Sequence, residues 1–142
     1  MTLPGPGKFQ RACLLLCIGL GSACASDVDP HAGHAAHGAP SGASCPDDSD
    51  LDYESFGAAF LDRYCISCHS SALSPAERGG APFGFDYDTH AGLWDSGIEH
   101  VDYVAAAGAA HENDFMPPRA TLLQPTGHER ALLGEWLSCG AP

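Results

Sequence analysis

The stretch Cys65-Ile66-Ser67-Cys68-His69 lies near the middle of this chain of 142 residues. Its two thiols are three positions apart, about one turn of an α-helix, which suits bonding to the two vinyl groups of a single haem. The imidazole of His69 follows directly, so it can reach the haem iron from the same turn. Cys-x-x-Cys-His is the spacing that attaches c-type haem. It therefore predicts one haem c, bound covalently by Cys65 and Cys68 with His69 as an iron ligand.

Two other interpretations of the Cys-x-x-Cys pair remain open at this stage. A thioredoxin-like dithiol has the same spacing, but it belongs to a parallel βαβ unit, and no such alternation of strand and helix patterns is visible. Half of a zinc site also has this spacing. A second Cys or His pair at ligand spacing does not follow, although scattered histidines could supply ligands.

Helical patterns flank the motif on both sides. Before it, Asp52 is a plausible N-cap for a helix of about a dozen residues whose apolar face runs into the motif. After it, a short amphipathic helix is predicted from Ile98 to Ala105. A last helix begins at a Thr126–Glu129 capping box and ends near Gly140. The apolar positions that carry these predictions are Phe56, Phe60, Tyr64, Ile98, Val101, Val104, Ala105, Leu132, Leu133, Trp136 and Leu137.

The N-terminus is typical of an exported lipoprotein. Lys8 and Arg11 precede a short apolar run, and Gly21-Ser22-Ala23-Cys24 resembles a lipobox with Gly in place of the usual Leu. We expect a signal peptide over 1–23, lipidation of Cys24, a flexible tether over 24–49 and a haem domain over 50–142. Ordinary signal cleavage after Ala25 is the alternative. Either way, the mature protein is expected at the cell envelope, on the periplasmic or outer-surface side.

The cysteine count predicts a disulfide. Cys24, Cys45, Cys65, Cys68 and Cys139 follow the predicted signal peptide. If the first carries lipid and the haem motif uses two, then Cys45 and Cys139 are left to pair in an oxidising compartment. Two unrelated buried thiols are the alternative.

Charge limits the partners. Four basic and 18 acidic residues follow the predicted signal peptide, a net charge near −14. Such a charge argues against nucleic acid as a partner. It suits a redox partner protein with a basic docking surface, although acidity can equally serve solubility alone.

Beyond the haem motif, the chain resembles class I c-type cytochromes, which are small helical monohaem electron carriers. The resemblance covers about Asp50 to Pro142. It includes Gly57, eight residues before Cys65, the Met116-Pro117-Pro118 element, and Leu133 with Trp136 in the last helix. It implies an all-α, cytochrome c-like fold in which the N- and C-terminal helices cross and loops wrap the haem pocket, with Phe85, Tyr87, Leu93 and Trp94 as apolar bulk.

The resemblance also implies a ligand set. Met116 is the only methionine after Met1, and its soft thioether is the expected sixth iron ligand. Class I cytochromes use a proline carbonyl about a dozen residues after the histidine to accept its other N–H. Pro82, 13 residues after His69, is predicted for this role, with one extra residue in the spacing. Arg78 is expected either to serve a haem propionate or to be solvated.

With histidine and methionine ligands filling both axial positions, the expected function is electron transfer at the cell envelope rather than catalysis. Two other classes stay open. One is a haem enzyme or sensor whose sixth ligand, Met116, is weakly held. If Met116 is not the sixth ligand, His90, His100 and His111 are the next candidates. The other is a metal-binding envelope lipoprotein that uses the dithiol and the cluster His31, His34 and His37.

Overall fold

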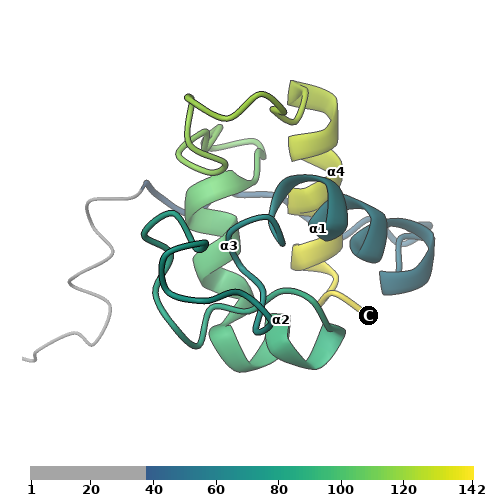
Figure 1. Cartoon of the computed structure of the whole chain (residues 1–142). Coiled ribbons are helices and arrows are strands. Elements are labelled where there is room, and N and C mark those ends of the chain that lie inside the picture. Colours follow the sequence, from purple (N-terminus) through teal and green to yellow (C-terminus); the bar gives the residue numbers. More distant parts are fainter. Residues whose placement is uncertain (1–37) are drawn as a thin grey trace, which may run out of the picture. The chain divides into compact units, whose positions relative to one another are not determined.

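The part of the chain that the computed structural model describes, residues 38–142, is all-α, as the sequence predicts (Figure 1). A π-helical turn, η2, spans Tyr53–Gly57 and continues into α1, Ala58–Tyr64. Helices α2, His90–Ser96, and α3, Ile98–Ala105, follow, and α4 spans Gly127–Ser138. The described residues form no β-strand, and none of their helices is both long and apolar enough to cross a membrane. The predicted signal peptide, Cys24 and the His31–His37 cluster lie outside the described residues.

The helix before the haem motif begins where the sequence predicts. Asp52 is its N-cap, because its carboxylate accepts a hydrogen bond from the Ser55 amide, and the Ser55 hydroxyl accepts one from the Asp52 amide. This capping box uses two of the backbone donors that a helix start leaves unpaired. The first turn differs from the expected α-helix, since the Gly57 amide bonds back to the Asp52 carbonyl over five residues.

The N-terminal helix crosses α4 at Gly57 (Figure 1). A Cβ atom built on Gly57 would collide with the Trp136 ring, so only glycine allows this approach. Trp136 is fully buried, and Phe56 packs against it edge-to-face with ring centroids 5.9 Å apart. The close contact of the two helices requires a glycine, and glycine lowers the stability of a helix by about 1 kcal/mol relative to alanine.

Both ends of α4 have the predicted chemistry. The Thr126–Glu129 capping box is confirmed at its start. At its end, the Gly140 amide bonds to the Leu137 carbonyl and the Ala141 amide to the Trp136 carbonyl, which is a Schellman motif with Gly140 at φ +87°. The Tyr64 hydroxyl also donates to Glu129 at 2.8 Å, joining the end of α1 to the start of α4.

The predicted tether ends earlier than the sequence suggests. Residues 38–45, which we call the strap, already belong to the folded unit, so the expected boundary at residue 49 is wrong. Ser41 is 1% exposed. Its amide donates to Asp102 at 2.9 Å, and its carbonyl accepts from the amides of Ala110 and His111. Polar and small residues gave no apolar period, because this segment is held by backbone hydrogen bonds rather than by an apolar face.

A disulfide joins the end of the strap to the C-terminal end of α4. It links Cys45 and Cys139, whose Cα atoms are 4.8 Å apart and which lie 94 positions apart in the sequence. This is the pair that the cysteine count predicts. It ties the first and last parts of the folded unit together.

We expect Gly57→Ala to lower the free energy of unfolding by about 1–2 kcal/mol, because the clash with Trp136 outweighs the gain in helix propensity. Urea denaturation followed by tryptophan fluorescence measures this. Ala59→Leu, at an exposed position of the same helix, is the control and should change stability by less than about 0.5 kcal/mol. A Gly57→Ala protein as stable as the wild type would contradict the close contact.

Removing the bridge with Cys45→Ser and Cys139→Ser should cost about 2–5 kcal/mol of stability, because the unfolded chain gains conformational freedom. Denaturation of wild type and double variant, each with and without reductant, makes the comparison. Reductant should weaken the wild type and leave the double variant unchanged. Equal stability of the oxidised wild type and the double variant would show that the bridge does not stabilise the fold.

Candidate functional site

A cavity of about 510 Å³ lies between α1, α3 and the loops that follow the haem motif and precede α4. Its walls bring together Cys65, Cys68, His69 and Met116, which the sequence predicts as one site. Most of the remaining lining is apolar or small. It comprises Phe60, Tyr64, Ser67, Arg78, Gly79, Gly80, Ala81, Pro82, Phe85, Tyr87, His100, Val101, Val104, Ala105, Pro117, Pro118 and Thr121.

The haem motif forms a tight turn at the end of α1. The amide of Cys65 still bonds to the Leu61 carbonyl, and the amides of Cys68 and His69 both bond to the Cys65 carbonyl. This turn directs two sulfurs and one imidazole to the same cavity. Gly79, at φ +60°, approaches it from the other side, where an added Cβ would lie 3.4 Å from the Cys68 sulfur.

The two thiols of the motif both line the cavity. They are free rather than joined in a disulfide. Burial raises the pKa of the Cys65 thiol to about 12, whereas a reactive dithiol has a lowered pKa. Within residues 38–142, no group of three or more His, Cys, Asp or Glu side chains is placed to hold a metal ion.

His69 has the tautomer that a metal ligand needs. Its Nδ1 lies 2.9 Å from the Phe85 carbonyl oxygen, and since that oxygen can only accept, Nδ1 carries the proton. Burial lowers the pKa of the imidazole, while the bond to Phe85 acts in the opposite direction. A neutral ring with a protonated Nδ1 leaves the Nε2 lone pair available to a metal.

The prediction that Pro82 accepts the His69 proton is wrong. The Pro82 carbonyl instead accepts from Arg78 at 2.8 Å, and Phe85 provides the acceptor for His69. The loop is longer than the expected spacing, so the carbonyl that faces the imidazole comes three residues later. The segment after Phe85 also stays beside the motif, because the Tyr87 amide donates to the His69 carbonyl.

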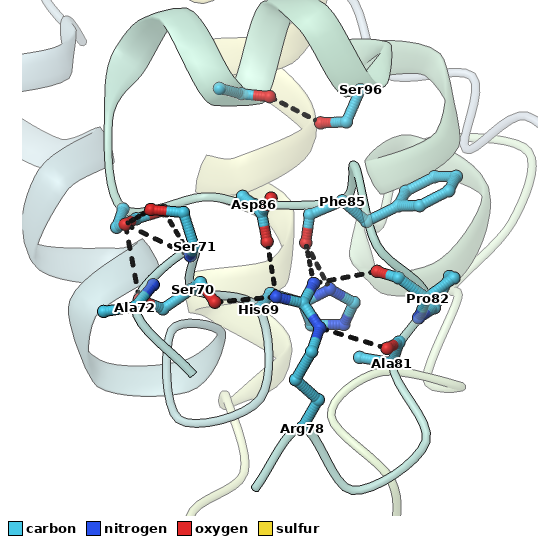
Figure 2. Close-up of polar contacts among 12 residues, drawn as sticks. His69, Ser70, Ser71, Ala72, Arg78, Ala81, Pro82, Phe85, Asp86 and Ser96 are labelled. Carbon is cyan, nitrogen blue, oxygen red and sulfur yellow. Dashed lines mark hydrogen bonds and ion pairs between the residues drawn. The ribbon is translucent and has the colours of Figure 1, made fainter. Parts of the chain in front are cut away.

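Arg78 organises this loop from its interior, so the expectation that it is solvated is also wrong. It is 1% exposed, and Figure 2 shows its guanidinium among backbone carbonyls beside the His69 ring. It also forms an ion pair with Asp86 at 2.7 Å. The carbonyl oxygens that accept from it belong to Ser70, Ala81, Pro82 and Phe85.

Met116 also lines the cavity and lies in the loop between α3 and α4. Its amide donates to the Val104 carbonyl at 2.9 Å, and its own carbonyl accepts from Arg130 at 2.8 Å. Pro117 and Pro118 line the cavity next to it. These two hydrogen bonds hold the backbone of Met116, and its side chain packs against the hydrophobic core.

Among the alternative histidines, only His100 lines the cavity. His90 lies beside the C-terminus, 2.7 Å from the Ala141 carbonyl, and His111 is exposed beside the strap. Leu93 and Trp94, expected as bulk around the pocket, do not line it, whereas Phe85 and Tyr87 do. Leu93 is fully buried elsewhere in the core, and Trp94 is half exposed.

Sequence reasoning missed the Phe85 carbonyl and the burial of Arg130. No residue type marks a backbone acceptor, so Phe85 left no signal. Arg130 did leave one, because it lies three and seven positions before Leu133 and Leu137 and therefore on the buried face of the last helix.

In comparisons with known proteins, the chain matches no family model, no curated protein and no solved structure. The resemblance to class I cytochromes thus stays an expectation from the motifs. What supports a function is the set of residues that share the cavity.

Proposed function

We propose that this protein is an electron carrier of the cell envelope that binds one haem c covalently through Cys65 and Cys68. In this proposal His69 and Met116 would be the residues that bind the iron of that haem. The observation that carries it is that both thiols, the imidazole and the only methionine after Met1 line one cavity, although Met116 is 47 residues from His69.

The chemistry of this donor set fits a haem. Two protonated thiols can add to vinyl groups, a neutral imidazole offers Nε2, and a thioether is a soft ligand suited to iron in an electron carrier. The cavity, about 510 Å³ with mostly apolar walls, lies within the range of about 300–1,000 Å³ typical of cofactor sites. The contact between Gly57 and Trp136, together with loops that border the cavity, supports a cytochrome c-like version of the helical fold.

The protein's own residues would keep the site fixed and largely closed to water. A haem supplies reversible one-electron chemistry when bound. Phe85 orients His69, Arg78 holds the loop around it, and the walls from α1 and α3 provide apolar packing. A thioether ligand raises the reduction potential relative to a second imidazole. With His69 and Met116 both bound to the iron, no position on it would be left for a substrate, so the proposed activity is electron transfer.

The proposed location rests on the N-terminal sequence, and the proposed partner rests on the net charge of the chain. Lipidation at Cys24 would anchor the protein to a membrane at the cell envelope. The strongly acidic chain would favour a redox partner with a basic docking surface, because complementary charge raises the rate of encounter.

Replacing both Cys65 and Cys68 with alanine should abolish covalent haem attachment when the protein is made with the c-type maturation machinery. Haem staining of denaturing gels measures this. The Cys45→Ser and Cys139→Ser double variant is the matched control, since it also removes two cysteines yet leaves the motif intact, and it should stain. Staining of the Cys65→Ala, Cys68→Ala protein would refute attachment at this motif.

We expect Met116→His to keep a six-coordinate iron but to lower the reduction potential, by on the order of 0.1 V within the ~0.8 V range that axial ligands span. Met116→Ala should open one position and allow the reduced protein to bind CO. Redox titration and CO difference spectra measure both effects.

His100→Ala is the control, because His100 is the other candidate ligand in the same cavity. It should leave the potential and the resistance to CO nearly unchanged. If Met116→Ala keeps the wild-type potential and His100→Ala instead admits CO, His100 is the sixth ligand.

A further inference from the structure

Arg130 is a cation buried in the middle of the fold. It projects from α4 and is 3% exposed. In the described part of the chain the ion pairs are Arg78 with Asp86 and Arg119 with Asp114, so no carboxylate pairs with Arg130 at close range. A buried charge is costly unless hydrogen bonds compensate it. The hydrogen-bond partners of Arg130 therefore indicate its structural role.

Most partners of Arg130 are backbone carbonyls at the end of α3 and in the Met116 loop, and its Nη2 also donates to the side-chain oxygen of Gln124 at 3.5 Å. Its Nη1 lies 2.8 Å from the Ala105 carbonyl, 3.0 Å from that of Asn113 and 2.8 Å from that of Met116. Ala105 is the last residue of α3, where unpaired carbonyls carry the negative end of the helix dipole. The helix end thus compensates the buried positive charge.

The same helix end also binds the Met116 loop directly. The Met116 amide donates to the Val104 carbonyl, and the Asn113 side-chain amide donates to the Asp102 carbonyl. Met116 is thereby fixed on both sides of its Cα atom, by α3 through its amide and by Arg130 through its carbonyl. Within residues 38–142, the hydrogen bonds of the Arg130 side chain join the helix end to the Met116 carbonyl.

We propose that Arg130 is a positioning residue that holds Met116 at the cavity. The ligand role of Met116 rests on the proposed function, but the effect of Arg130 on the loop does not. A single lysine ammonium keeps the charge and loses the planar fork, so Arg130→Lys separates geometry from charge. Loss of one charge-assisted hydrogen bond should raise the population of the open loop about tenfold.

The first test uses haem-free protein and needs no assumption about the cofactor. Met116 is the only methionine after Met1, so its oxidation by dilute peroxide can be followed by peptide mass spectrometry. Arg130→Lys and Arg130→Gln should each oxidise about tenfold faster at Met116 than the wild type. Arg119→Lys is the matched control, because Arg119 lies in the same loop but is exposed and ion-paired with Asp114. It should oxidise at the wild-type rate.

Hydrogen exchange separates loosening of the loop from unfolding of the domain. In the Arg130 variants, peptides around Met116 should exchange faster, while peptides of α1 should stay protected as in the wild type. If Arg130→Gln does not fold, Arg130→Lys decides the question. An Arg130→Lys protein that folds and oxidises Met116 at the wild-type rate, or one that exchanges faster everywhere, overturns the proposal.

The second test uses haem-loaded protein. Arg130→Lys should retain the covalent haem content of the wild type but bind CO when reduced, which the wild type should resist. Unchanged CO resistance would contradict the positioning of Met116 as a ligand. If the wild type itself attaches no haem, the proposed function fails, yet the oxidation rates still decide whether Arg130 holds the loop.

Discussion

The contact between Gly57 and Trp136 fixes where the haem motif lies. Because Gly57 has no Cβ atom, the Trp136 ring can occupy that space and the N-terminal helix packs directly against α4. The hydrogen bond from Tyr64 to Glu129 then holds the end of α1 near the start of α4. Cys65 follows immediately, so the turn that carries the two thiols and His69 starts from a fixed point. The loop that follows is held beside this turn by the hydrogen bond from the Tyr87 amide to the His69 carbonyl.

The rest of the cavity is held mainly by polar bonds to loops, since the helices are short. Two buried arginines each hold one of the loops that border the cavity. Arg78 holds the loop on the His69 side, and Arg130 holds the loop on the Met116 side. Only four basic residues follow the predicted signal peptide, and half of them are used inside the fold. A cavity fixed in this way changes little in shape, which suits the proposed electron transfer.

The sequence predicted what depends on local patterns. The caps at Asp52 and Thr126 and the apolar faces of the helices rest on residue type and spacing, whereas the Cys45–Cys139 pair followed from the cysteine count. What it missed depends on tertiary contacts. The strap binds through backbone groups that have no residue signature, and the acceptor of His69 shifted to Phe85 because the loop has a different length. Arg78 and Arg130 were missed because arginine is usually exposed.

We propose that the cavity holds one covalent haem whose iron would be bound by His69 and Met116. The most direct measurement is a spectroelectrochemical titration of wild-type protein made with the c-type maturation machinery, with CO added to the reduced form. The account predicts one covalent haem per chain, a reversible one-electron transition and a reduced spectrum that CO does not change. A folded protein with the Cys45–Cys139 bridge intact and no covalent haem would contradict it.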